Sequence, residues 1–386
     1  MRAFLKSLVV LSSFSLLCTA CGGVDDLGEP LDSDVVEESD AALSASQRAV
    51  VFTLSNEEQN AVLAFRRASD GTLSPAGSIP TGGKGSGGGL GSQGALAFSK
   101  DYRWLFAVNA GSNQITSFEV YGSGLVFTDL VDSGGERPVS LTVKNGLLYV
   151  AHAGGGGNIT GFRITPSGHL RPIANSTRPL SAANAGPAQV EFSPDGSRLV
   201  VTEKATNKIS SYQVQDDGTA VGPLVSESRG MTPFGFTFSR SKLLIVSEAF
   251  GGAPGKSATS SYRLDDVGSA RVVSGSVANG QGAACWAVAT KNGAYAFISN
   301  TGSGTITRYI VDAAGGLHLG DDGRTGLTGD GSRPADMALS SSNEYLYVVN
   351  PGTRTVGAFH VSADGGLTAL SGASNLPASI VGLVAR

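Results

Sequence analysis

The sequence of 386 residues has little charge, little cysteine and little histidine. Charged residues make up 16% of the chain and the formal net charge is −4, which excludes a basic nucleic-acid surface. With three cysteines and four histidines, the chain has no Gly-x-Ser-x-Gly elbow, no pair of Cys-x-x-Cys motifs and no His-Glu-x-x-His motif. Serine-hydrolase and zinc sites of these motif classes are therefore not indicated.

Glycine and apolar residues are abundant instead. Glycine supplies 54 residues and hydrophobic residues 41% of the chain, so the sequence is neither disordered nor collagen-like. High glycine with low charge is typical of many short strands joined by tight turns. A single large all-β domain is consistent with this length.

The first twenty residues have the pattern of a secretory signal. An apolar stretch from Leu8 to Leu17 follows two basic residues and is too short for a permanent membrane helix. It ends in Leu17-Cys18-Thr19-Ala20-Cys21-Gly22, where small residues before a cysteine resemble a bacterial lipoprotein cleavage box. We expect residues 1–20 to be the signal peptide and Cys21 to carry lipid, with an ordinary signal cut nearby as the alternative.

Residues 21–47 are acidic and contain no basic residue. Such a segment repels itself and cannot bury apolar surface, so we expect a disordered tether. Gly22 after the lipidated cysteine favours the outer membrane or the cell surface over inner-membrane retention. Once Cys18 leaves with the signal and Cys21 carries lipid, Cys285 is the one remaining thiol and no intrachain disulfide can form.

A repeat of about fifty residues fills positions 48–386. Each copy contains an apolar strand that closes on a polar residue, as in Leu105-Phe106-Ala107-Val108-Asn109 and Leu346-Tyr347-Val348-Val349-Asn350. The seven closing residues are Asn56, Asn109, His152, Glu203, Glu248, Asn300 and Asn350. A third strand with an aromatic residue and a polar Asp/Gly turn follow in most copies. Four short strands per copy predict an all-β, seven-bladed β-propeller with four-stranded antiparallel blades.

The ring must also close. Nothing before Ala49 resembles an inner strand, whereas Pro377–Leu383 resembles the inner-strand segment Pro334–Leu339. We therefore expect the C-terminal strand to complete the first blade beside residues 49–55, which also removes an exposed sheet edge.

The turn Ser193-Pro194-Asp195-Gly196 with its Leu-Val-Val strand resembles the seven-bladed lactonase family, which includes propeller-type 6-phosphogluconolactonases and carboxymuconate cycloisomerases. The Tyr-Val-x-Asn units also resemble YVTN-type surface propellers. The resemblance covers residues 49–386. In the enzymes it implies a His and an Arg at inner-strand starts and a Glu at the end of a second strand. That Glu corresponds to Glu248, whereas Pro233-Phe234-Gly235 stands where the family has Pro-Arg-His.

Equivalent second strands should end at one face, so we expect their closing residues to gather toward the channel mouth. Glu248, Glu203 and His152 come from adjacent blades and are our candidate catalytic residues, because carboxylates and imidazole suit acid–base chemistry. The alternative is that the closing residue caps a hairpin turn in each blade.

Five further residues are candidates for substrate binding. Lys204 would hold an anionic group, or form a surface pair with Glu203. The others stand at inner-strand starts, with Trp286 as a stacking platform or, together with Cys285, as core filling. These four are Gln189, Phe234, Trp286 and Asp336.

Two functions remain open from the sequence. The first is a lactonase-like hydrolase or cycloisomerase acting on a cyclic ester or sugar lactone. The second is a non-catalytic propeller that binds a glycan, a peptide or another envelope protein. We expect a monomer attached to the bacterial envelope by its lipid alone, without nucleic acid as a partner. We expect no cofactor, and a divalent cation in the channel has no sequence support.

Overall fold

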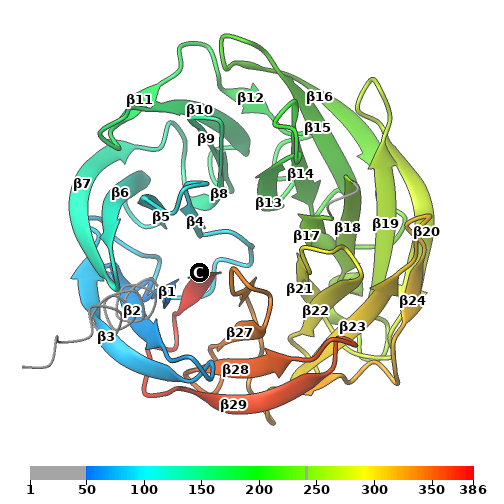
Figure 1. Ribbon diagram of the computed structural model, residues 1–386. Helices are drawn as coiled ribbons and strands as arrows, with labels where there is room; N and C mark the ends of the chain where they lie inside the picture. The colour runs from blue at the N-terminus through cyan, green and yellow to red at the C-terminus, as the bar shows by residue number, and fades with distance from the viewer. Residues whose placement is uncertain (1–48, 240–241) are drawn as a thin grey trace, which may run out of the picture. The chain divides into compact units, whose positions relative to one another are not determined.

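The computed structural model describes residues 49–239 and 242–386. These residues form seven β-sheets around a common axis (Figure 1). The predicted propeller of seven antiparallel blades is therefore confirmed. Within the described ranges, no helix has the length and apolar character needed to cross a bilayer. The predicted signal peptide 1–20, the lipidation of Cys21 and the tether 21–47 lie outside the described residues.

Each blade runs from an inner strand at the axis to an outer strand at the rim. Blade 1 consists of β30 (Val381–Ala385), β1 (Val50–Leu54), β2 (Ala61–Arg67) and β3 (Leu73–Pro80). Blade 2 consists of β4 (Leu96–Phe98), β5 (Trp104–Asn109), β6 (Gln114–Tyr121) and β7 (Gly124–Asp132). Blade 3 consists of β8 (Pro138–Lys144), β9 (Leu147–His152), β10 (Asn158–Ile164), β11 (Leu170–Pro172) and β12 (Arg178–Pro179).

The remaining blades follow the same order. Blade 4 consists of β13 (Pro187–Phe192), β14 (Arg198–Glu203), β15 (Lys208–Val214) and β16 (Ala220–Glu227). Blade 5 consists of β17 (Pro233–Phe238), β18 (Leu243–Glu248), β19 (Ala258–Leu264) and β20 (Ala270–Ala278), with the short 3-10 helix η1 (Phe250–Gly252) before β19. Blade 6 consists of β21 (Ala284–Ala289), β22 (Tyr295–Asn300), β23 (Thr305–Val311), β24 (Leu317–Leu319) and β25 (Gly326–Leu327). Blade 7 consists of β26 (Met337–Leu339), β27 (Tyr345–Asn350), β28 (Thr355–Val361) and β29 (Leu367–Ala373).

Blades 3 and 6 depart from the regular pattern at the rim. Their outer strand is divided into two short pieces, and both pieces pair with the third strand of the blade. Both pieces occupy the position of the fourth strand, so each of these blades still has four strand positions from the axis to the rim.

The ring closes as the repeat predicts. β30 pairs antiparallel with β1, with Thr53 opposite Leu383. The Thr53 hydroxyl donates to the carbonyl oxygens of Val381 (3.1 Å) and Gly382 (2.6 Å), although these residues are more than three hundred positions away in the chain. The inner strand of blade 1 is thus supplied by the C-terminal segment, and the first blade has no open inner edge.

The core lies between neighbouring blades, because each sheet is apolar on both faces. The second strands β5, β9, β18 and β27 are buried along their whole length. The aromatic residues of the third strands are at most 4% exposed. Each such burial contributes on the order of 2 kcal/mol. These residues are Phe65, Phe118, Phe162, Tyr212, Tyr262, Tyr309 and Phe359.

The polar turns at the rim also connect blades. Gly168, in the turn between β10 and β11, has φ +78°, and a Cβ there would lie 2.3 Å from Cζ3 of Trp104 in blade 2. Its carbonyl oxygen accepts a hydrogen bond from the Ser117 hydroxyl (2.7 Å). Glycine is needed here because the turn backbone packs directly on the neighbouring blade.

Candidate functional site

The seven residues that close the second strands share a structural role, and we call them the latch residues. Each is at most 2% exposed and hydrogen-bonds to nearby turns or strands, in most blades to the loop that enters its own blade. Asn109 accepts hydrogen bonds from Asn60 (2.9 Å) and Thr81 (2.6 Å), and Asn300 accepts one from Asn279 (3.0 Å). The set consists of Asn56, Asn109, His152, Glu203, Glu248, Asn300 and Asn350.

The carboxylates of the latch residues Glu203 and Glu248 accept several hydrogen bonds from within the protein. Glu203 accepts hydrogen bonds from the backbone N–H of Ser181 (3.0 Å) and the hydroxyls of Ser210 (2.6 Å) and Thr206 (2.8 Å). The hydroxyl of Ser181 also donates to Glu203.

Glu248 follows the same scheme in the next blade. It accepts from the N–H of Gly230 (2.8 Å) and from the hydroxyls of Ser260 (2.5 Å) and Ser276 (2.6 Å). Burial raises the pKa of Glu248, and these hydrogen bonds partly offset the increase.

His152 occupies the same position in blade 3. Its Nε2 lies 3.0 Å from the Ser133 hydroxyl, in the loop between β7 and β8. Burial lowers the pKa of His152 to about 4, so the imidazole is neutral at neutral pH. The structure therefore does not bring His152, Glu203 and Glu248 into one cluster: each holds a loop in its own blade.

A strap crosses the axis of the ring just before β4. We call residues 89–95 the axial strap; in Figure 1 this segment runs into the centre of the ring. The N–H of Gln93 donates to the carbonyl of Ala188 (2.9 Å), and the Ser92 hydroxyl donates to the carbonyl of Val139 (2.8 Å). The Gln93 side chain exchanges two hydrogen bonds with the backbone of Ala287 (2.8 and 3.0 Å). The strap is thus fixed to inner strands on several sides of the axis.

Several predicted binding residues do meet at this strap. The rings of Phe234 and Trp286 lie 5.0 Å apart between centroids, and the ammonium of Lys204 lies 4.8 Å from the Phe234 ring centroid. The ammonium donates to the carbonyl of Gly91, and the indole N–H of Trp286 donates to the carbonyl of Ser92 (2.9 Å). Burial lowers the pKa of Lys204 to about 8.

Gln189 and Cys285 are both buried residues of inner strands. The Gln189 side chain accepts from the N–H of Phe236 (2.7 Å) and donates to Glu191 (2.8 Å), so it ties two inner strands together. Cys285 is buried, and burial raises the pKa of its thiol to about 12. The thiol is therefore protonated at neutral pH.

A cavity of about 400 Å³ opens beside the strap, and we call it the axial pocket. Its walls include Trp286, Asp336, Arg333 and the C-terminal segment from Ala378 to Gly382. Asp336 is 3% exposed, and burial raises its pKa to about 8 even though the N–H groups of Gly94 and Gly382 lower it. Two of the predicted binding residues, Trp286 and Asp336, thus line a ligand-sized cavity.

Arg333 was missed by the sequence analysis. It is exposed, has φ +54° and precedes Pro334 at the entrance to blade 7. Arg137 precedes Pro138 at the same point of blade 3, with φ +55°. The signal that could have pointed to this position is the Arg-Pro pair at two equivalent blade entrances.

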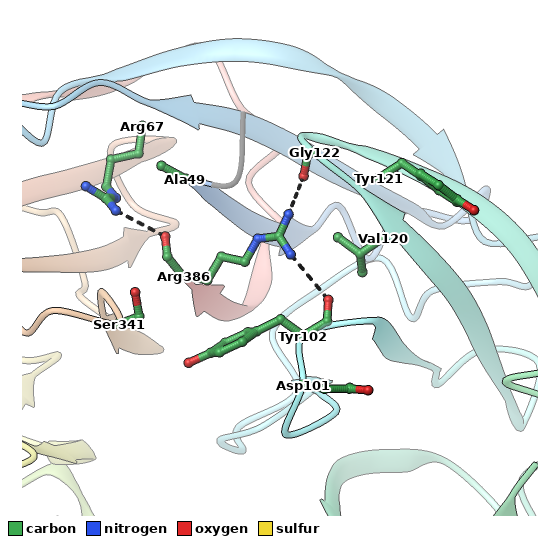
Figure 2. Close-up of a pocket in the computed structure, with 9 residues that line it drawn as sticks. All are labelled: Ala49, Arg67, Asp101, Tyr102, Val120, Tyr121, Gly122, Ser341 and Arg386. Atoms are coloured by element: carbon green, nitrogen blue, oxygen red, sulfur yellow. Dashed lines mark hydrogen bonds between the residues drawn. The ribbon is translucent and has the colours of Figure 1, made fainter. Parts of the chain in front are cut away.

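A second cavity, of about 470 Å³, lies beside the closure of the ring (Figure 2). The Arg386 guanidinium donates to the carbonyl oxygens of Gly122 (2.8 Å) and Tyr102 (3.3 Å), and Arg67 donates to the Arg386 carbonyl (3.4 Å). Arg386 therefore connects blade 1 to blade 2. This cavity is larger than the axial pocket, but its guanidinium groups are already hydrogen-bonded to backbone carbonyls. We therefore take the axial pocket as the candidate site.

Metal ligands are not clustered in the described part of the chain. Among residues 49–239 and 242–386, no three His, Cys, Asp or Glu side chains are grouped closely enough to hold a metal ion.

Comparisons with known proteins agree with this architecture. Residues 44–181 match the family model "Lactonase, 7-bladed beta-propeller". No curated protein matches the chain.

Solved structures of similar fold cover nearly all of the ring. A protein from Lactobacillus plantarum is 20% identical, with a TM-score of 0.72 over 88% of this chain and 99% of its own. The periplasmic gluconolactonase of Pseudomonas aeruginosa is 18% identical, with a TM-score of 0.67 over 86% and 98%. A predicted 6-phosphogluconolactonase from Bacteroides uniformis is 17% identical, with a TM-score of 0.67 over 86% and 99%. Residues 44–181 are therefore similar in sequence to the lactonase family, and the ring as a whole shares the fold of these structures.

Proposed function

We propose that the chain hydrolyses a cyclic ester, such as a sugar lactone, in the axial pocket. The observation that carries this proposal is the set of residue types that line one pocket: an aromatic, a cationic and a buried acidic residue, Trp286, Arg333 and Asp336. The volume of about 400 Å³ suits a single sugar-sized ring. The family match over residues 44–181 gives independent support for lactone chemistry.

Each of these groups fits a requirement of lactone hydrolysis. The flat face of Trp286 offers a surface for the ring of the ligand. The Arg333 guanidinium suits the carbonyl oxygen, on which negative charge develops when water attacks. Phe234 stands where the related enzymes are expected to have Arg and His, so the proton chemistry must come from other residues of this chain.

The test is turnover of a panel of γ- and δ-lactones, followed by the release of acid and corrected for spontaneous hydrolysis. The chain should open at least one lactone, and Arg333→Ala should lower kcat/KM by about 100-fold, as is typical for loss of an oxyanion donor. Arg324→Ala, at another exposed arginine outside the axial pocket, is the matched control. A full-length protein that opens none of the lactones contradicts the proposal.

Binding without catalysis is the second candidate. It is favoured by the engagement of Glu203 and Glu248, the two predicted catalytic carboxylates, in latch hydrogen bonds. In that case the axial pocket would hold a glycan or peptide end. Calorimetric binding of a glycan without any turnover of lactones would support this function over hydrolysis.

We further propose that this activity is held at the bacterial envelope by a lipid on Cys21. The support is the signal pattern of residues 1–20 and the small residues before Cys21.

A further inference from the structure

We propose that Asp336 is the proton donor of the axial pocket: its carboxyl group protonates the ring oxygen of a bound lactone as the acyl C–O bond breaks. This inference rests on the proposed hydrolysis and assigns the group that performs its proton transfer. It starts from the position of Asp336, which lines the axial pocket together with Trp286 yet is only 3% exposed.

The surroundings of Asp336 keep its carboxyl group protonated. Its Oδ2 faces the backbone N–H of Gly94 at 3.4 Å, a weak hydrogen bond, and the N–H of Gly382 also points toward the carboxyl. No salt bridge to Asp336 occurs in the described residues. A carboxyl group that is buried without a cationic partner retains its proton near neutral pH.

Three parts of the chain around the axial pocket carry charged or polar groups. Arg333, three positions before Asp336, also lines the pocket. The ammonium group of Lys204 donates a hydrogen bond to the Gly91 carbonyl of the axial strap. The strap itself and the segment around Gly382 present backbone N–H groups. The N–H groups of Gly94 and Gly382 favour the ionised carboxyl, and burial outweighs them, since the pKa of Asp336 is raised to about 8.

The proposed step is balanced with water as the one co-reactant. The oxygen of a water molecule forms a bond to the acyl carbon, and the bond between that carbon and the ring oxygen breaks. The Asp336 carboxyl gives its proton to the ring oxygen, which becomes the hydroxyl of the product. One proton of the attacking water passes to the Asp336 carboxylate, so the residue returns to its starting state.

Asp336→Asn is the central variant, because asparagine keeps an oxygen acceptor for the Gly94 N–H but cannot donate a labile acidic proton. We expect kcat to fall by about 100-fold or more with little change in KM, as is usual for loss of a general acid. Wild-type kcat, corrected for spontaneous hydrolysis, should decline above about pH 8, and this decline should be absent from the variant.

A comparison of two six-membered lactones tests the direction of proton transfer. Dihydrocoumarin releases a phenol, which needs less protonation than the alcohol released from δ-valerolactone. Asp336→Asn should therefore impair δ-valerolactone hydrolysis far more than dihydrocoumarin hydrolysis. Equal losses on both substrates would overturn the assignment.

Glu191→Gln is the matched control. Glu191 also lies on an inner strand and its pKa is also raised to about 8, but it is outside the lining of the axial pocket. This variant should keep the wild-type kcat and pH profile.

The outcomes separate the two proposals. Wild-type protein without lactone turnover refutes the proposed function, and the role of Asp336 with it. If the wild-type protein is active but its kcat does not decline at alkaline pH, the role of Asp336 is refuted and the proposed function stands. The same holds if Asp336→Asn keeps the wild-type kcat. If the variant does not fold, as judged by its melting curve, the pH profile of the wild-type kcat still decides.

Discussion

Gln93 and Ala287, 194 positions apart in the chain, exchange two hydrogen bonds across the axis of the ring. The Gln93 amide donates to the carbonyl of Ala287 and accepts from its N–H, which fixes the axial strap to the inner strand of blade 6. The strap carries no regular secondary structure before β4, so these bonds and their counterparts on other blades hold it in place.

Replacing Gln93 should therefore destabilise the whole ring. Gln93→Ala leaves the buried N–H and carbonyl of Ala287 without partners, which should cost about 2–4 kcal/mol. Urea unfolding followed by tryptophan fluorescence measures this change. Gln213→Ala, at an exposed glutamine, should change stability by less than about 0.5 kcal/mol. Equal stability of the two variants would show that the strap is not structural.

Removal of residues 377–386 should unfold or aggregate the ring. The deletion takes away β30, exposes the inner edge of β1 and leaves the Thr53 hydroxyl without its two carbonyl partners. Size-exclusion chromatography and a melting curve check this outcome. A truncated monomer that melts at the wild-type temperature would contradict the closure.

His152→Asn should make the protein less sensitive to acid. The folded-state pKa of His152 is about 4, below the ordinary value of 6.5, so the folded state binds fewer protons than the unfolded state. The stability from this neutral imidazole is present above pH 6.5 and is lost as pH falls toward 4. Asparagine stands at the equivalent position of blades 1, 2, 6 and 7.

Melting temperatures between pH 4 and pH 8 measure the effect. The variant should lose less stability than the wild type between pH 6.5 and pH 4. Parallel curves for the two proteins would mean that His152 is not buried in its neutral form.

Substitutions of Glu248 distinguish a structural role of this residue from a catalytic one. Glu248→Ala should lower stability by about 2–4 kcal/mol, because the N–H of Gly230 and two serine hydroxyls lose their acceptor. Glu248→Gln keeps an oxygen acceptor, so we expect lactone kcat to stay within about twofold of the wild type. Loss of kcat in a fully folded Glu248→Gln protein would return this residue to the catalytic role predicted from the sequence.

Cys21→Ala should release the protein from the membrane fraction. The proposed lipid is carried by the thiol of Cys21, so its loss removes the anchor while the ring is unchanged. Fractionation of cells and metabolic labelling with palmitate give the measurement, with Cys18→Ala as the matched control. Labelling that persists in Cys21→Ala would place the modification elsewhere.

The propeller could be predicted from sequence because its information is local and repeated. The apolar strand before each closing residue and the aromatic residue after it occur in every blade, and the likeness between Pro334–Leu339 and the C-terminal segment indicated the closure. The divided rim strands of blades 3 and 6 were not predicted, although Gly320-Asp321-Asp322-Gly323 between β24 and β25 is a turn signal.

The site was harder to predict. Glu203, Glu248 and His152 stood out because they differ from asparagine, yet each of them bonds the loop that enters its blade, as Asn109 and Asn300 do. The axial strap was not predicted, because its hydrogen-bond partners lie on distant strands and leave no local pattern in the sequence. Trp286 and Asp336 were found because inner-strand starts converge on the axis, and Arg333 was missed because it precedes the strand.

The axial strap also forms part of the wall of the axial pocket. Leu90, Gly91 and Ser92 line the pocket, and the indole of Trp286 is hydrogen-bonded to the Ser92 carbonyl. The same bonds that hold the strap therefore also shape the site. A substitution that loosens the strap should alter ligand binding and ring stability together.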